Sequence, residues 1–232
     1  MESISPLFDR TISCPLCKTT YKTKKIRSRF VKIEKHESDF RPIYSDPSIN
    51  PTYYNVHVCS SCGYSHTDEF SKHMVPVIKS ELEQKISAHW QKQYFGEERS
   101  TQDAIRAYKL AIINATIKRE KKVTLAGLFL RVAWLYRELN QEEEEQRFLK
   151  LSASCYEESY LNDDFSGTQM SDVKVLYMIA ELSRRCGNET KAVKYLSKVI
   201  EKQNTTTDRK IIDMAKEQWY EYRENRKKEQ AN

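Results

Sequence analysis

The stretch NVHVCSSCGYSH, residues 55–66, contains one Cys-x-x-Cys pair, and ISCPLCKTT, residues 12–20, contains another. Two residues between cysteines allow a tight turn to direct both sulfurs of a pair toward one point. Two such turns build a tetrahedral site of four thiolates, which suits zinc. The predicted ligands of one structural Zn²⁺ ion are Cys14, Cys17, Cys59 and Cys62.

Other uses of the same cysteines stay open at this point. CPLC is similar to a thioredoxin-like redox motif, but that fold needs a strand before the motif and βαβ units after it, and neither is evident. An iron–sulfur cluster or a single iron ion also accepts four cysteines. In the zinc interpretation Gly63 follows its pair because the turn needs a positive φ there. Four protein ligands close the site to water, so metal catalysis is not expected.

The interval between the pairs is 41 residues long, from residue 18 to residue 58. We predict that it holds a strand pair at about 26–34 and 53–59, joined through a proline-containing loop at 43–52. His57 alternates with Val56 and Val58, which predicts a solvent-facing imidazole. Tyr53 and Tyr54, beside the second pair, are expected to pack over the zinc site, or alternatively to stack on a base or peptide.

Length and composition favour a helical protein with a small core. The chain has 232 residues, 39% of them hydrophobic and 31% charged, with only 5 Gly and 6 Pro. The net charge of +6 is too mild to indicate a nucleic-acid-binding protein by itself. The N-terminal residues lack the apolar run of a signal peptide, and no window is apolar enough to span a membrane. We therefore expect a cytoplasmic protein whose cysteines are thiols or metal ligands.

Residues 71–228 have the periodicity of about seven successive helices. The segment 175–200 is similar to a tetratricopeptide repeat, with 128–152 as a weaker copy and 103–115 resembling a lone second helix. Ala133 and Ala180 are 47 residues apart, rather than the 34 of a regular array, so an irregular helical bundle is the alternative. The predicted fold is mainly α, with three parts: a small β zinc-ribbon-like domain at 1–70, a tetratricopeptide-like array at 71–228 and a frayed tail at 229–232.

A basic run at 18–35 holds eight Lys or Arg residues and one Glu. On a ribbon strand Lys25, Arg27 and Arg29 would share one face and could follow phosphate groups. The alternative is a solvated edge strand, which natural sheets often protect with charged residues. The nucleic-acid candidates are Lys22, Lys24, Lys25, Arg27 and Arg29.

No pattern of a catalytic site is present. The chain has no glycine-rich phosphate loop, no Gly-x-Ser-x-Gly and no His-Glu-x-x-His. The segment 36–46 is unusual because Asp39, Phe40, Arg41 and Tyr44 could form a specific surface, although no reaction is indicated for them.

Together these segments resemble the uncharacterised bacterial family labelled domain of unknown function 2225, over roughly residues 10–222. The most specific matches are Cys14, Pro15, Cys17, Asp39, Phe40, Tyr54, Cys59, Cys62, Gly63 and Tyr64. The resemblance implies a bacterial, cytosolic protein with a zinc-ribbon-like start and repeat-like helices, and it implies no catalytic residue.

The sequence leads to one main functional hypothesis and two alternatives. We expect a non-enzymatic zinc-binding adaptor or scaffold that binds a protein or peptide partner through its helical repeats. The first alternative is a nucleic-acid-associated protein that uses the basic segment at 22–35. The second is an enzyme, redox or hydrolytic.

Overall fold

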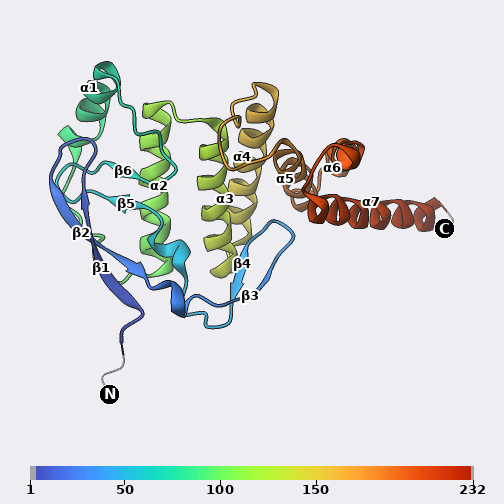
Figure 1. Cartoon of the computed structure of the whole chain (residues 1–232), viewed down its shortest axis with the longest axis horizontal. Coiled ribbons are helices and arrows are strands. Elements are labelled where there is room, and N and C mark those ends of the chain that lie inside the picture. The colour runs from blue at the N-terminus through green and yellow to red at the C-terminus, as the bar shows by residue number, and fades with distance from the viewer. Residues whose placement is uncertain (1–3, 231–232) are drawn as a thin grey trace. The chain divides into compact units, whose positions relative to one another are not determined.

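The structure, a computed structural model, describes residues 4–230 and is mainly helical, as predicted (Figure 1). Over this range there are seven α-helices: α1 (Pro76–Lys85), α2 (Thr101–Lys118), α3 (Lys122–Glu138), α4 (Glu142–Leu161), α5 (Asp172–Arg185), α6 (Glu189–Glu201) and α7 (Arg209–Gln230). Of the predicted frayed tail, residues 229–230 are the last two of α7, and residues 231–232 lie outside the described range.

The strands are short and form three two-stranded antiparallel sheets, each made from strands adjacent in the sequence. They are β1 (Leu7–Ser13) with β2 (Thr20–Ile26), β3 (Ile33–His36) with β4 (Pro42–Tyr44), and β5 (His57–Val58) with β6 (Ser65–His66). The predicted pairing of 26–34 with 53–59 is therefore wrong. Residues 28–30 and 51–54 are 3₁₀ turns, and the second begins at Pro51, which cannot donate to a strand ladder. Local hairpins also close shorter loops at a smaller entropic cost.

Contacts within the chain define two compact units. The first consists of residues up to 120 together with 128–145, and the second of 121–127 together with residues from 146 onward. Helices α3 and α4 each contribute residues to both units. The predicted division after residue 70 separates a ribbon-like part from a repeat-like part, and it stays a prediction.

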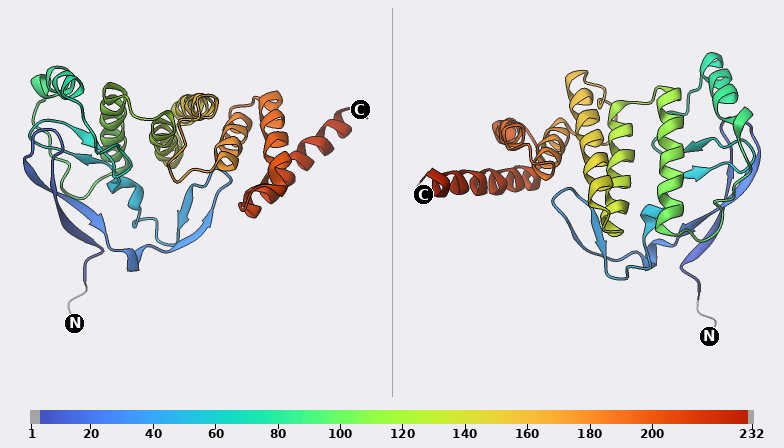
Figure 2. Two further views of the ribbon diagram at one scale, coloured as in Figure 1. Left: turned by 45° about the horizontal axis from the view of Figure 1, so that its top comes forward. Right: turned by 180° about the vertical axis from the view of Figure 1, so that it is seen from behind.

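In the first unit the two cysteine-bearing hairpins lie beside helices rather than against another sheet. The hairpin of β5 and β6 packs against α2 (Figure 2), and α1 covers the cysteines with Ile78 and Leu82. Helix α2 begins at Thr101, because Ser100 and Asp103 form a reciprocal capping box. Cys14, Cys59 and Cys62 thus belong to one hydrophobic cluster of this unit.

The segment between the cysteine pairs is attached to α3 by buried charges. Asp39 is fully buried and accepts hydrogen bonds from Trp134 Nε1 at 3.0 Å and from Arg137 at 2.9 Å. Arg137 also donates to Glu37 and to Glu145, the latter at 2.7 Å. The predicted surface that includes Asp39 is therefore wrong for this residue, since its carboxylate anchors the hairpin of β3 and β4 to the helix.

In the second unit α5 is buried along nearly its whole length and packs against α6 and α7. Ser171 caps the start of α5, Gly187 ends it with a φ of +74°, and Asn188 caps the start of α6. The hydrophobic positions of α5 and α6 face each other, with Ala180 and Ala192 fully buried. The helices at 175–200 therefore form the predicted antiparallel hairpin, while their membership of a tetratricopeptide array stays a prediction.

Candidate metal centre

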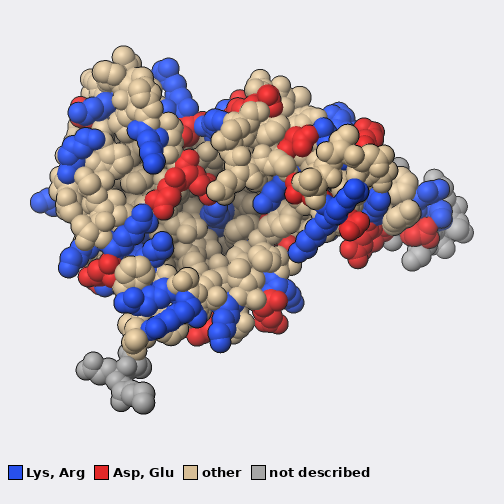
Figure 3. Space-filling view, in the orientation of Figure 1, with Lys and Arg blue, Asp and Glu red and all other residues tan. Residues whose placement is uncertain are grey.

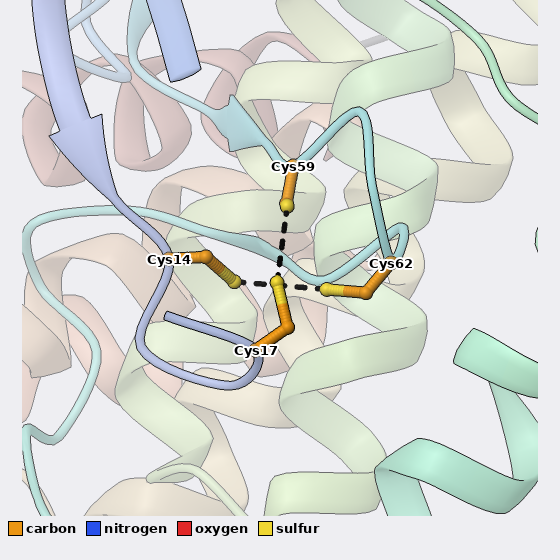
Figure 4. A group of neighbouring side chains, drawn as sticks. All are labelled: Cys14, Cys17, Cys59 and Cys62. Carbon is orange, nitrogen blue, oxygen red and sulfur yellow. Dashed lines mark hydrogen bonds between the residues drawn. The ribbon is translucent and has the colours of Figure 1, made fainter. Parts of the chain in front are cut away.

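Each cysteine pair lies in the turn of a hairpin. Cys14 and Cys17 occupy the turn between β1 and β2, and Cys59 and Cys62 occupy the turn between β5 and β6. Figure 4 shows the four side chains pointing from these two turns toward one point. The local backbone therefore presents the sulfurs in pairs, and the packing of the two hairpins brings the pairs together.

The four sulfurs fit a tetrahedral metal. They all lie within 4.8 Å of one another, and the Cys14–Cys62 and Cys17–Cys59 Sγ–Sγ distances are both 3.6 Å. A tetrahedral site with metal–sulfur bonds of about 2.3 Å has sulfur–sulfur edges of about 3.8 Å. Three of the cysteines are buried and Cys17 is the most exposed. The donor set matches a closed four-thiolate centre.

Electrostatics within the cluster also favour a cation. The pKa of Cys14 is lowered to about 5, mainly by the hydrogen bond with the Cys62 thiol, and the same bond raises the pKa of Cys62. Burial raises the pKa of Cys59 to about 11. Negative charges this close repel one another, so the four thiols do not all lose their protons in the absence of a cation. A metal ion between them removes this repulsion and stabilises all four thiolates.

The two turns share one backbone frame. In the first, Cys14 N donates to Thr19 O at 2.9 Å and Lys18 N donates to Cys14 O at 3.0 Å. In the second, Cys59 N donates to Tyr64 O at 3.0 Å and Gly63 N donates to Cys59 O at 2.9 Å.

Backbone N–H groups inside each turn also bind the first sulfur of the pair. Cys14 accepts from Leu16 and Cys17, and Cys59 accepts from Ser61 and Cys62. These bonds stabilise thiolate charge, as the metal-site prediction requires.

The residue after each pair has a left-handed conformation. Gly63 has a φ of +74°, which confirms the conformation predicted for it, and Lys18 has a φ of +65°. A Cβ at position 63 would lie 2.4 Å from Cε3 of Trp90, whose Nε1 donates to Ser60 O at 2.9 Å. Trp90 therefore covers the second turn, a contact that no local sequence pattern indicated.

Two predictions about nearby aromatic residues are wrong. His57 is only 4% exposed, because the hairpin of β5 and β6 packs against α2 instead of presenting an open face. Tyr54 does not pack on the cysteines; its hydroxyl accepts a hydrogen bond from Arg99 N at 3.2 Å. Arg99, which the sequence did not single out, is buried and donates to the carbonyls of Phe95, Tyr53 and Val56, which fixes the chain before β5.

The basic candidates fall into two sets. Lys22 and Lys24 form ion pairs with Asp9, and Lys24 also pairs with Glu97. Lys25, Arg27 and Arg29 instead line one shallow hollow. They do not share a strand face as predicted, since β2 ends at Ile26 and residues 28–30 form a 3₁₀ turn. Nucleic-acid binding by these residues stays a prediction.

Comparison with known proteins gives a family but no characterised relative. No curated protein and no solved structure matches the chain significantly. Within residues 4–230, the longest and most apolar helices still fall short of what a membrane crossing requires. A family model described as "Uncharacterized protein conserved in bacteria (DUF2225)" matches residues 7–222, which include all four cysteines of the centre. The chain therefore belongs to this bacterial family, DUF2225.

Proposed function

We propose that this protein is a non-enzymatic adaptor or scaffold of the bacterial cytoplasm, held in shape by one Zn²⁺ ion. In this proposal it binds a protein or peptide partner through its helical hairpins. The single observation that carries the proposal is the buried antiparallel hairpin of α5 and α6, continued by α7. Stacked hairpins of this kind present extended surfaces that commonly hold a peptide or a partner helix.

The metal in this proposal has a structural role. Cys14, Leu16, Tyr21, Cys59, Cys62 and Tyr64 form one buried cluster with Ile78 and Leu82 of α1. A bound Zn²⁺ would neutralise the thiolates and hold the two hairpins together, which adds its binding energy to folding. Elemental analysis of protein purified from bacteria is expected to give one zinc per chain. A stoichiometric amount of iron would reject zinc as the metal.

The second unit offers residues suited to partner contact at the C-terminal part of α7. Tyr220 is 59% exposed and stacks edge-to-face on Trp219, while the Arg223 guanidinium lies 5.5 Å from the Trp219 ring centroid. Tryptophan, tyrosine and arginine are the side chains that contribute most often to protein interface energy. We therefore assign Trp219, Tyr220 and Arg223 as the primary partner contact.

The adaptor function is tested by affinity capture from bacterial lysate, with and without nuclease, followed by mass spectrometry. One dominant protein should be retained in both samples by the wild type, and its recovery should fall at least about tenfold with Tyr220→Ala combined with Arg223→Ala. Asp213→Ala, an exposed position on the same helix, is the matched control and should retain it. Equal recovery by all three proteins would reject this contact, and no nuclease-resistant partner would reject the adaptor function.

A second candidate function is association with nucleic acid. It is favoured by the hollow lined by Lys25, Arg27 and Arg29, whose other described lining residues are Phe8, Ile26 and Ser28, with no carboxylate among them. Binding of single-stranded RNA should fall steeply with salt and weaken when these three residues become Glu. Unchanged binding by that variant would remove the candidate.

A further inference from the structure

Two hollows of the first unit meet at the end of β2. The shallow one, of about 400 Å³, contains Lys25, Arg27 and Arg29. The deeper one, of about 220 Å³, also contains Lys25 and Ile26, together with Tyr54, Pro51 and Asp68. Because the same two β2 residues line both, the hollows are neighbours on one surface. Figure 3 shows Lys and Arg side chains gathered over β1 and β2 on this side of the molecule.

The shallow hollow has the chemistry of a phosphate site. The guanidinium of Arg27 lies 4.8 Å from the centroid of the Phe8 ring, and that of Arg29 lies 4.9 Å from the centroid of Phe30. Arg27 Nε is also held by Ser5 O at 3.3 Å. These contacts order the two guanidinium groups before a ligand arrives, which lowers the entropic cost of binding. Guanidinium groups bind phosphate oxygens in pairs, and a lysine adds a point charge.

The deeper hollow has a different character, because both apolar and polar residues line it. Ile26, Pro51 and Tyr54 supply apolar surface. Among the polar residues, Asp68 is paired with Arg10 at 3.3 Å and lies 3.5 Å from His57 Nε2, and Arg131 donates to Glu69 at 2.9 Å. Each carboxylate thus has a cationic partner and retains lone pairs for a ligand N–H. A flat ring with an exocyclic amine matches this combination.

The sizes of the two hollows point to one ligand with two parts. A volume of about 220 Å³ is below the range of about 300–1,000 Å³ that is usual for a complete small-molecule site. Lys25, for which no ion pair is found among the described residues, lies where the two parts would join. A ligand with a ring at one end and phosphate at the other fills both hollows and neutralises the excess positive charge.

We propose that this surface is a nucleotide-binding site, with an amine-bearing base in the deeper hollow and phosphate on Lys25, Arg27 and Arg29. The nucleotide is either free or part of a single strand, because both present the same base and phosphate. The inference is independent of the adaptor function. It rests on the second candidate function, association with nucleic acid, only if the nucleotide is part of a strand.

The first experiment measures binding of the full chain to cytidine triphosphate, pyrophosphate and a cytidine-containing single-stranded RNA at two salt concentrations. Lys25→Ala and Arg27→Gln should each weaken nucleotide binding about tenfold, as loss of a charged hydrogen bond does. Lys22→Ala is the matched control, since Lys22 lies on the same strand but pairs with Asp9, and it should change affinity less than about twofold. Unchanged melting temperatures show that the variants fold.

The outcomes distinguish a free nucleotide from a nucleotide within a strand, and they include the results that would overturn the proposal. If Lys25→Ala weakens the binding of cytidine triphosphate, the ligand is a free nucleotide. If Lys25→Ala weakens only the binding of the RNA strand, the ligand is a nucleotide within a strand. Strand binding that ignores Lys25 and Arg27 overturns this site but leaves nucleic-acid association standing elsewhere. Pyrophosphate that binds as tightly as cytidine triphosphate overturns the base-binding hollow, and the absence of all binding overturns the whole inference.

A second experiment tests the base. Cytidine carries an amine at ring position 4 and an acceptor nitrogen at position 3, whereas uridine carries a carbonyl oxygen at position 4 and an N–H at position 3. The wild type should prefer cytidine triphosphate about tenfold, and Asp68→Asn should reduce that preference to less than about twofold, because an amide can also donate to the carbonyl oxygen. Equal affinity of the wild type for both nucleotides would contradict the role of the carboxylates.

Discussion

The two cysteine turns have the same backbone frame but different residues after the second cysteine. Lys18 occupies this left-handed position in the first turn and Gly63 in the second. The first turn is at the surface, where Lys18 Nζ reaches Pro15 O at 2.9 Å. The second lies under Trp90, with no space for a Cβ. The two turns therefore have the same backbone geometry, but only the second is restricted by a packed neighbouring side chain.

The backbone geometry that metal binding requires is therefore distinct from the small side chain that packing requires. The hydrogen bonds that direct each pair of sulfurs are the same in both turns, so they do not require glycine. A left-handed lysine costs about 1 kcal/mol or more, which the frame tolerates. Glycine is required only at position 63, because the indole ring lies against it. The aromatic cover thus makes one turn much more sensitive to substitution than the other.

The largest expected effect comes from removing a ligand. Cys62→Ser and Cys17→Ser should both lose stoichiometric zinc, because three thiolates bind far more weakly than four. Structural zinc sites contribute about 10–16 kcal/mol of apparent binding energy at neutral pH in small peptides. Cys62→Ser should lower the melting temperature more, since it also places a hydroxyl in a buried position.

Zinc content and thermal unfolding, with and without chelator, measure these effects. Cys155→Ser changes a thiol outside the centre and is the control. Full zinc occupancy in either ligand variant would show that the cluster does not hold the metal as proposed.

A smaller but selective effect is expected for Gly63→Ala. The added methyl meets Trp90 at 2.4 Å and forces a left-handed alanine, so the expected cost is about 2–4 kcal/mol. Lys18→Ala keeps a non-glycine residue in the exposed turn and should cost less than about 0.5 kcal/mol. Denaturant unfolding of the zinc-bound proteins compares the two, and equal costs would refute the difference between the turns.

A double-mutant cycle isolates the contribution of the aromatic cover. Trp90→Leu should destabilise by itself, because it removes apolar area and the bond to Ser60 O. It should also relieve the clash of Gly63→Ala, giving a coupling of about 1–3 kcal/mol. If the loss of stability in the double variant equals the sum of the two single losses, Gly63→Ala destabilises through backbone strain alone.

A small effect of either sign is expected for Lys18→Gly. Glycine relieves the left-handed strain but raises the entropy of the unfolded chain, so the net change should stay within about 1 kcal/mol. Zinc content should not change. A loss of metal would show that the lysine side chain, through its bond to Pro15 O, is part of the frame after all.

Sequence patterns predicted local features well because those features depend on few neighbouring residues. The positive φ at Gly63 and the helical hairpin at 175–200 follow from local steric limits and from the hydrophobic period. The strand pairing between the cysteine pairs and the exposure of His57 were predicted wrongly. Both depend on which distant element covers a segment, here α2 and α3, and that is not encoded in short periodicity.

By itself the sequence determined the two sulfur pairs, the mainly helical class and the hairpin at 175–200, since cysteine spacing, hydrophobic period and caps act over a few residues. Only the tertiary structure brought the four sulfurs within 4.8 Å and laid Trp90 over Gly63. It also separated Lys22 and Lys24 from Lys25, Arg27 and Arg29. These features involve residues far apart in the chain or depend on where a strand ends. They are therefore determined by the packing of the whole unit.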